Sequence, residues 1–366
     1  MDAGKDDYMP TTRQHFVPKS YLKAWETSVR NSHEPTKRFE GVYVFTDKAG
    51  KGEGRNTKSI LWSQSLYTVK YADYLYIHGK YPEIDNDFIY GIREVLCNDF
   101  LKPINASYSG NSIISDQNIL DSLVYLDDWD FFYNDGTVAP KKRIINQIKN
   151  LSSQCLEKGL DDVFEKSWAA TRDSFISAVE KEVKNKKTSP YCIPREKAEQ
   201  MVRFFYSMLC RNPEFDSFGI YTKVKDRILR PVGLTEELIE EIMRPQWIGE
   251  LYRMVFGGSG GFFNLGISQT FQACQMILFQ RYADACHFIT SDNPSFRYIS
   301  MVEVQNHNGF YFPLGPDYLL MIAKGKDGIE KVDYRFADDV TVRMINRKIY
   351  NSKTKLLVAN QRYLPI

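Results

Sequence analysis

Near its N-terminus the chain carries the sequence QHFVPKSYLKAW, in which three side chains could do chemistry together. His15 precedes a bend limited by a proline, and its imidazole exchanges a proton near neutral pH, as a general acid or base must. Lys19 and Tyr21 follow at the expected start of a helix, where free backbone N–H groups and a positive end favour a phosphate. We therefore take His15 as a catalytic candidate and the other two as substrate-binding candidates. The alternative is a buried histidine that fastens the N-terminal segment.

A second polar group occurs in the sequence FITSDNPSF, residues 288–296. An expected strand delivers Ser291, Asp292 and Asn293 into a turn that a proline limits, and loops of this kind often present functional side chains. Asp292 is a catalytic candidate that would orient His15 or hold a divalent metal such as Mg²⁺, because hard cations prefer oxygen ligands. Ser291 and Asn293 are candidates for substrate binding. The alternative is an Asx–Pro turn with no task beyond the turn itself.

A third candidate is Arg211, which ends an expected helix in the sequence LCRNP at 209–213. A guanidinium in a pocket can clamp an anion through two parallel hydrogen bonds, which makes Arg211 a third catalytic candidate. The alternative is that arginine at the end of a helix only complements the helix dipole.

Composition and missing motifs exclude several classes of protein. The 366 residues include 48 basic and 46 acidic side chains, so the net charge of +2 gives no global attraction for nucleic acid or anionic membranes. No run approaches the ~18 apolar residues of a membrane span, and the N-terminus is not a secretory signal. Six cysteines form no CxxC pair, and P-loop, GxSxG and HExxH motifs are absent. We expect a cytoplasmic protein with no membrane partner.

The periodicity of apolar residues predicts a helix-rich α+β fold, with small sheet pieces near both ends and helices between them. The expected strands are 41–45, 65–69, 72–77, 287–292, 295–300, 309–314 and 317–323. The expected helices are 85–104, 115–133, 141–157, 196–211, 235–254, 268–282 and 337–360.

These elements predict a flexible N-terminus over residues 1–13 and a single large domain over 14–366, with a helical middle at about 85–282. The sheet pieces of the two ends would come together, so that residues 14–25 lie beside residues 287–296. His15 and Asp292 would then share one cleft.

Taken together, these segments resemble the domain-of-unknown-function 4238 family, whose members are mostly bacterial. The resemblance spans most of the chain and is carried by HFVPKSYLKAW, IREVL, LCRNP, FITSDNP and FPLGPDYLLMI, and by the polar helix around Asn346. Trp25 is one departure, because a phenylalanine is usual in the family at this position. The resemblance implies no established reaction. It implies that the recurrent polar positions of the family correspond here to His15, Arg211, Ser291 and Asp292.

These observations lead us to expect a nucleic-acid-directed hydrolase, such as a nuclease that serves as a toxin or phage-defence effector. His15 would act as acid or base, while Arg211 and Lys19 would stabilise the charge of the phosphoryl group. The expected partner is nucleic acid or a nucleotide, and the sequence leaves the question of protein partners open. Two alternatives stay open: a non-enzymatic binding or scaffold protein in a bacterial defence or mobile-element context, and a small-molecule enzyme that acts on a nucleotide.

Overall fold

The chain divides into two compact units, which are described separately below. The computed structural model describes residues 13–31, 34, 36–46, 50–97, 103–185, 188–211, 224–258, 260–298, 309–325 and 328–366. Unit 1 draws its described residues from the ranges 67–159 and 221–258, and unit 2 from 12–66, 160–220 and 259–366. The sequence predicts one large domain, whereas the contacts group into these two units. The predicted flexible segment, apart from its last residue, lies outside the described residues.

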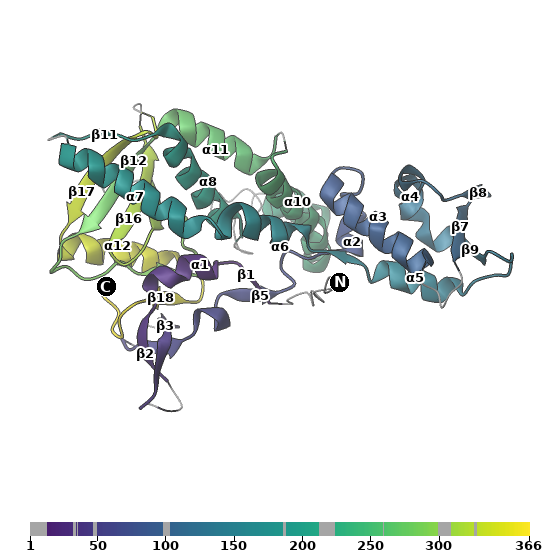
Figure 1. The fold of residues 1–366 in the computed structure, drawn as a ribbon, viewed down its shortest axis with the longest axis horizontal. Coiled ribbons are helices and arrows are strands. Elements are labelled where there is room, and N and C mark those ends of the chain that lie inside the picture. Colours follow the sequence, from purple (N-terminus) through teal and green to yellow (C-terminus); the bar gives the residue numbers. More distant parts are fainter. Residues whose placement is uncertain are drawn as a thin grey trace, which may run out of the picture. The chain divides into compact units, whose positions relative to one another are not determined.

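Unit 2 combines small sheets from both ends of the sequence with helices from the middle (Figure 1). Its strands are β1 (Arg13–His15), β2 (Thr27–Arg30), β3 (Arg38–Phe45), β4 (Glu53–Arg55), β5 (Trp62–Gln64), β11 (Tyr191–Cys192), β12 (Cys274–Arg281), β13 (Thr290–Ser291), β14 (Phe296–Tyr298), β15 (Gly309–Pro313), β16 (Tyr318–Lys324), β17 (Lys331–Ala337) and β18 (Leu357–Ala359). Its helices and helical turns are α1 (Lys19–Leu22), η1 (Lys23–Trp25), η2 (Thr57–Ser59), η4 (Asp161–Glu165), α7 (Trp168–Asn185), α8 (Arg195–Arg211), α11 (Phe262–Ala273) and α12 (Asp339–Ser352).

The six-stranded sheet of unit 2, ordered β11-β17-β12-β16-β15-β14, is covered on both faces. Alternate residues of a strand point to opposite faces. On β15, Tyr311 therefore joins a core cluster with α12 and β18, while Phe312 packs against aromatic rings of α1, α7 and α8. Leu319 and Met321 of the neighbouring β16 belong to the same cluster as Tyr311. The core of unit 2 therefore combines residues from both ends of the chain with helices from its middle.

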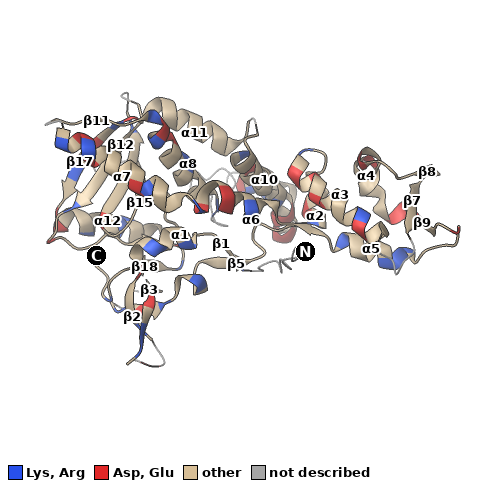
Figure 2. Ribbon diagram, viewed as in Figure 1, with Lys and Arg blue, Asp and Glu red and all other residues tan. Residues whose placement is uncertain are grey.

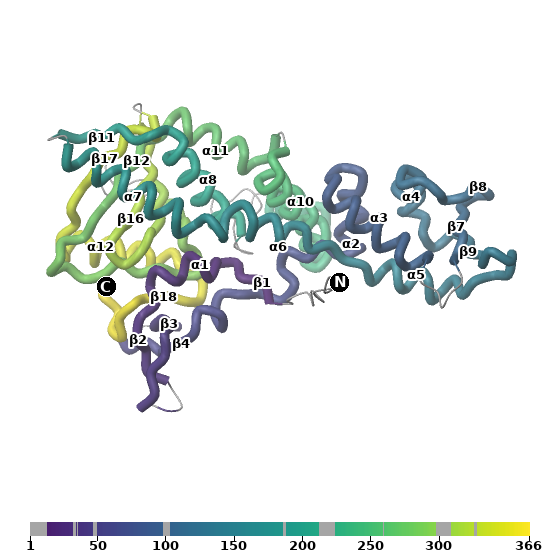
Figure 3. Tube along the Cα trace, viewed as in Figure 1, coloured from purple at the N-terminus to yellow at the C-terminus, as the bar shows by residue number. Residues whose placement is uncertain are grey.

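A second sheet of unit 2 joins the two ends of the chain directly. Its strand order is β13-β18-β3-β2, with β4 paired to β3. The C-terminal β18 runs antiparallel to the N-terminal β3, with Leu357 opposite Phe45, and Figure 3 shows these early and late segments side by side. The predicted meeting of the N-terminal and C-terminal sheet pieces is therefore confirmed.

Unit 1 is mainly helical. Its helices and helical turns are α2 (Tyr71–Tyr74), α3 (Pro82–Cys97), α4 (Asp116–Ser122), η3 (Leu123–Asp128), α5 (Lys141–Lys149), α6 (Cys155–Leu160, whose last residue falls in unit 2), η5 (Lys225–Leu229), η6 (Arg230–Val232) and α10 (Glu236–Phe256). Its strands are β6 (Val69–Lys70), β7 (Ile104–Tyr108), β8 (Asn111–Ser112), β9 (Asp130–Tyr133) and β10 (Ser152–Ser153). The ring of Tyr74 stacks on Phe88 with centroids 3.9 Å apart, and its hydroxyl donates to Asp85.

The α+β class and several long elements agree with the sequence analysis, whereas several other elements do not. The predicted strand 65–69 is mostly a turn, and the predicted helices 115–133, 141–157 and 337–360 contain the strands β9, β10 and β18 respectively. Two further differences have a clear physical reason. Residues 72–77, predicted as a strand, include the helix α2, because the Asp73 carboxylate accepts the Lys70 N–H and closes a helical turn. The predicted helix 268–282 ends at Ala273 and gives way to β12. This strand lies between two others and is buried on both faces, so it lacks the alternation that marks a strand in the sequence.

Two surface properties also bear on function. Within the described residues, no helix is both long and apolar enough to cross a membrane. In Figure 2 basic and acidic residues of unit 2 are interspersed rather than gathered into one field of a single sign. Any binding of a charged partner must therefore depend on local groups.

Candidate active site

The backbone around His15 is fixed by two neighbouring elements of unit 2. His15 ends β1 and lies opposite Trp62 of β5. The next two residues, Phe16 and Val17, both donate their N–H groups to the carbonyl of Leu61. Leu61 has a φ of 56°, a conformation that costs a bulky residue energy and that tends to occur at functional sites. The imidazole is thus held on a backbone that cannot easily shift.

Lys19 begins α1, which is only four residues long. A single turn cannot build the dipole or the ring of free N–H groups that the sequence suggested for binding a phosphate. No side chain caps this helix at Pro18. Any anion near His15 must therefore be bound by side chains.

A buried ion pair joins Glu165 and Arg211 beside His15. Glu165 ends η4, a π-helical turn, and turns of this kind occur frequently at functional sites. Arg211 ends α8 and is completely buried, and its Nη2 donates to Oε1 of Glu165 over 2.7 Å. The carboxylate remains 20% exposed. Because its guanidinium has no access to solvent, Arg211 positions Glu165 rather than contacting a substrate.

The surroundings of His15 favour its neutral form. Burial lowers the pKa of His15 below the ordinary value of 6.5, and the positive charge of Lys19 lowers it further. The Glu165 carboxylate and a hydrogen bond to the Lys58 backbone oppose this shift of the pKa. That bond favours the protonated ring, so an imidazole N–H donates to the Lys58 carbonyl. A neutral imidazole with one nitrogen held in this way keeps the other as a proton acceptor, and Nε2 of His15 is a buried atom in this structure.

A cavity of about 570 Å³ opens next to this cluster. Its charged lining consists of Lys19, Lys23, Glu26, Glu40, Lys58, Asp161, Glu165 and Lys166. The formal charges balance, but the acids are mostly engaged: Glu26 accepts from Thr57, Asp161 pairs with Lys166, and Glu165 pairs with Arg211.

The lysines of this cavity are engaged less than its acids. In the part of the chain that the structure describes, no carboxylate lies within ion-pair distance of Lys19, Lys23 or Lys58. Three of the four lysines of this cavity thus have no ion pair among the described residues, whereas two of its four acids, Asp161 and Glu165, are paired with cations, and this difference favours an anionic ligand.

Asp292 lies in a different setting, at the start of the turn after β13. It is only 3% exposed, and its carboxylate accepts the backbone N–H groups of three consecutive residues of the segment that leads into β18, namely Thr354, Lys355 and Leu356. Its own N–H donates to the Leu356 carbonyl. The geometry therefore gives Asp292 a structural task, and both its oxygens are already occupied.

The neighbours of Asp292 serve the same turn. Ser291 is completely buried, and its hydroxyl accepts the N–H of Asn293. The side-chain amide of Asn293 donates to the carbonyl of Ser352 at the end of α12. These bonds favour the Asx–Pro turn that the sequence offered as the alternative to substrate binding.

Tyr21 and Trp25 fasten the N-terminal segment to the C-terminal one. Both are completely buried. The Tyr21 hydroxyl donates to the Pro313 carbonyl over 2.8 Å and lies 2.9 Å from the Thr290 hydroxyl, while the Trp25 indole donates to the Phe288 carbonyl. Residues 14–25 therefore meet residues 287–296 as expected, but Tyr21 cannot stack on a substrate.

Comparison with known proteins identifies the family. Residues 13–362, nearly the whole chain, match the family described as a protein of unknown function, DUF4238. The chain belongs to the DUF4238 family. The comparison with curated proteins and the comparison with solved structures gave no match.

The sequence candidates of this DUF4238 chain thus separate into two groups. His15, Lys19 and Arg211 come together, whereas Tyr21 is completely buried as a packing residue. The side chains of Ser291, Asp292 and Asn293 form hydrogen bonds with the backbone of their own turn and of the segment beside it. Sequence reasoning did not single out Glu165, because it follows Asp161-Asp162 in a run that resembles an ordinary solvated helix end. Its only distinguishing signal is that it stands next to the buried helix face that starts at Trp168.

A metal-binding role is not favoured at these residues of the DUF4238 chain. Within the described residues no group of three or more histidine, cysteine, aspartate or glutamate side chains is arranged to hold a metal ion. Asp292, the candidate ligand for Mg²⁺, uses both carboxylate oxygens on backbone N–H groups. The chemistry that the site can offer from its own side chains is proton transfer by His15 beside lysines.

Proposed function

We propose that this protein is a hydrolase that cleaves phosphodiester bonds in nucleic acid, with His15 as general base and then general acid. The observation that carries the proposal is the partly buried imidazole with a lowered pKa, next to a cavity in which three of the four lysines, Lys19, Lys23 and Lys58, have no carboxylate partner in the described part of the chain. Neutral imidazole is the form that can accept a proton near pH 7.

The residues divide the work as follows. His15 takes a proton from the attacking oxygen, either water or a ribose hydroxyl, as a new bond to phosphorus forms. The bond from phosphorus to the leaving oxygen breaks, and the protonated imidazole returns the proton to that oxygen. Lys19 and Lys58 neutralise the charge that develops on the phosphoryl oxygens. Glu165, held by Arg211, stabilises the imidazolium.

The test measures cleavage by the purified chain of labelled RNA, single-stranded DNA and double-stranded DNA, with Mg²⁺ and with EDTA, and of free nucleotides. His15→Gln is expected to lower the rate on the cleaved substrate by about a hundredfold or more, because general acid–base catalysis contributes roughly 10²–10⁴-fold. His78→Gln, which removes a histidine of unit 1, is the matched control and keeps the rate. Absence of cleavage, or equal rates in His15→Gln and the native protein, would contradict the proposal. Cleavage of nucleotides alone would shift the substrate to a small molecule.

One observation favours a second function, a non-enzymatic binding or scaffold protein. Several polar residues that the sequence singled out, among them Tyr21, Asp292 and Arg211, are buried and make structural bonds. If His15 belongs to the same class, His15→Gln lowers the free energy of unfolding by about 1–3 kcal/mol and no substrate is cleaved. If His15 is catalytic, the variant keeps its stability and loses the rate.

A further inference from the structure

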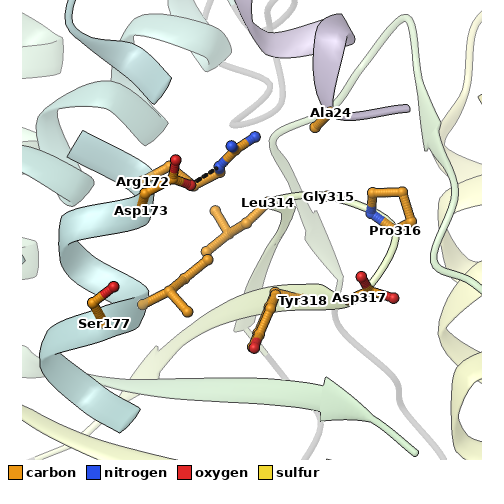
Figure 4. Close-up of a pocket in the computed structure, with 10 residues that line it drawn as sticks. Ala24, Arg172, Asp173, Ser177, Leu314, Gly315, Pro316, Asp317 and Tyr318 are labelled. Atoms are coloured by element: carbon orange, nitrogen blue, oxygen red, sulfur yellow. Dashed lines mark hydrogen bonds and ion pairs between the residues drawn. The ribbon is translucent and has the colours of Figure 1, made fainter. Parts of the chain in front are cut away.

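A second cavity of unit 2, of about 350 Å³, is lined by residues that the proposed hydrolysis does not use. One wall is the face of α7 that carries Arg172 and Ser177, and the opposite wall is the turn between β15 and β16 at residues 314–318, with Ala24 of η1 at the rim (Figure 4). Its volume lies at the lower end of the range found for small-molecule sites.

Arg172 is the feature of this cavity that points to a ligand. Its side chain is only 19% exposed, and its Nε donates to Oδ1 of Asp173 over 2.8 Å. Among the described residues this is its one hydrogen bond, so the two terminal nitrogens have no protein acceptor. Figure 4 shows the guanidinium extending from α7 toward Ala24. Two parallel N–H donors on a half-buried guanidinium match the two oxygens of a carboxylate or a phosphate.

The other groups of the cavity decide between these two anions. Asp173 on the α7 wall and Asp317 on the opposite wall both carry negative charge, and among the described residues the contacts of the Asp317 carboxylate are made by Oδ1, with Arg281 at 2.7 Å and His287 at 3.9 Å. Two carboxylates around one available guanidinium oppose a dianion more than a monoanion. A monocarboxylate therefore fits this balance of charge better than a phosphate monoester.

The rest of the lining indicates the body of the ligand. Ile176 on the α7 wall and Leu314 and Pro316 on the opposite wall add apolar side chains to the lining. Figure 4 shows Leu314 between Arg172 and Tyr318. The Tyr318 hydroxyl is already committed to Glu180 and accepts from Gln280, so the tyrosine offers its ring edge rather than a free polar group. A ligand whose apolar body contacts these side chains would place its charged group at Arg172.

We propose that this cavity binds a small monocarboxylate with an apolar body, and that Arg172 holds the carboxylate. The site is separate from the His15 cluster, because Arg172 and the β15–β16 turn line this cavity alone, and the proposal does not depend on the proposed hydrolysis.

The experiment measures binding of four probes of similar size to the full chain by titration calorimetry, near neutral pH. The probes are phenylacetate, phenyl phosphate, 2-phenylethanol and phenethylamine, which carry one negative charge, nearly two, none and one positive charge. Phenylacetate is expected to bind most tightly. No binding of phenylacetate up to about 10 mM, tighter binding of phenyl phosphate, or equal binding of 2-phenylethanol would overturn the proposal.

Variants then assign the binding to this cavity. Arg172→Gln is expected to weaken the binding of phenylacetate by roughly tenfold, because the substitution removes charge-assisted hydrogen bonds. Ser177→Trp, at an exposed position of α7, is expected to block the cavity without altering the core or the charge, and it keeps the proposal testable if Arg172→Gln fails to fold. Arg195→Gln removes an exposed arginine of α8 and is the matched control, with binding unchanged. Unchanged binding in both Arg172→Gln and Ser177→Trp, or an equal loss in Arg195→Gln, would refute the assignment.

Discussion

The polar cluster at His15 and the polar turn at Asp292 differ in how their hydrogen bonds are completed. At Asp292 one carboxylate accepts three backbone N–H groups and is 3% exposed, so every bond of the turn serves the chain itself. At His15 the ion pair of Glu165 and Arg211 is internal, but the neighbouring lysines face a cavity without a carboxylate partner among the described residues. A closed network stabilises a fold, whereas charge left open toward a cavity can act on a ligand.

This comparison shows why polar residue type alone does not identify a site. Both clusters contain residues whose side chains could carry out catalysis, and both are largely buried. The two clusters differ in whether a side-chain donor or acceptor remains for a ligand once the hydrogen bonds within the protein have formed. The predictions below test this difference by measuring stability, because removal of a hydrogen bond or ion pair within the protein should lower the free energy of unfolding.

The largest expected effect comes from breaking the buried ion pair. Glu165→Gln leaves the completely buried guanidinium of Arg211 without its carboxylate and is expected to lower the free energy of unfolding by about 3–5 kcal/mol. The double variant Glu165→Gln with Arg211→Met should recover part of this loss, because no buried charge is left. Denaturation in urea measures the free energies of unfolding of the single and the double variant.

The matched control for the ion pair is Glu199→Gln, which breaks an exposed pair with Arg195 at the same kind of distance, 2.8 Å. Exposed pairs of this type contribute about 0.3–0.5 kcal/mol. If Glu165→Gln lowers the free energy of unfolding no more than Glu199→Gln does, the pair of Glu165 and Arg211 contributes no more than an exposed ion pair.

The second effect tests the closed turn. Asp292→Ala leaves three backbone N–H groups without their acceptor and is expected to cost about 3 kcal/mol, at about 1 kcal/mol for each bond. Asp292→Asn keeps one acceptor oxygen and should cost about half as much. If Asp292→Ala is as stable as the native protein, water replaces the carboxylate and the turn is not the closed network described here.

Much of the fold follows from sequence patterns, while the site depends on contacts that no local pattern encodes. The helices α8 and α10 and the strands β15 and β16 lie close to their predicted bounds, whereas α3 begins near its predicted start and ends at Cys97. The two strands are short apolar runs separated by the turn at Gly315 and Pro316, which fixes their bounds. The strand β12 was missed because it is buried on both faces and therefore reads like a buried helix.

The candidate site was only half predictable for a similar reason. Residue type and the proline bend drew attention to His15, but its partner Glu165 lies 150 positions later in a turn without a motif. The pairing of His15 with Asp292 stays a prediction: the segments that carry them meet through Tyr21 and Trp25, but the carboxylate of Asp292 accepts backbone N–H groups of its own turn. One residue along a strand or turn changes the direction of a side chain entirely.

A smaller effect tests the contact that joins the two ends of the chain. Tyr21→Phe removes the hydroxyl that donates to Pro313 and lies beside Thr290, and it keeps the ring in place. The expected cost is about 1–2 kcal/mol in the free energy of unfolding, because the Pro313 carbonyl and the Thr290 hydroxyl both lose a buried hydrogen-bond partner. Tyr363→Phe, at a position that is 66% exposed, is the control and should cost nothing measurable. Equal stabilities of the two variants would mean that packing alone fastens the N-terminal segment.

The smallest expected effect is the dependence of stability on pH that His15 contributes. Burial and Lys19 lower the pKa of His15 below 6.5, so the unfolded chain binds this proton more readily than the folded protein does. The contribution to stability is complete above about pH 6.5 and is lost as the pH falls through the lowered pKa of the folded state. His15→Gln should therefore lose less stability than the native protein when the pH is lowered from about 7.5 to about 5.5.

The pKa of His287 is also lowered by burial, so His287→Gln should independently reduce the dependence of stability on pH, and the effects of the two substitutions should add. If the profile of His15→Gln coincides with that of the native protein, His15 titrates as an exposed histidine does, and the neutral base at the centre of the proposed site is lost.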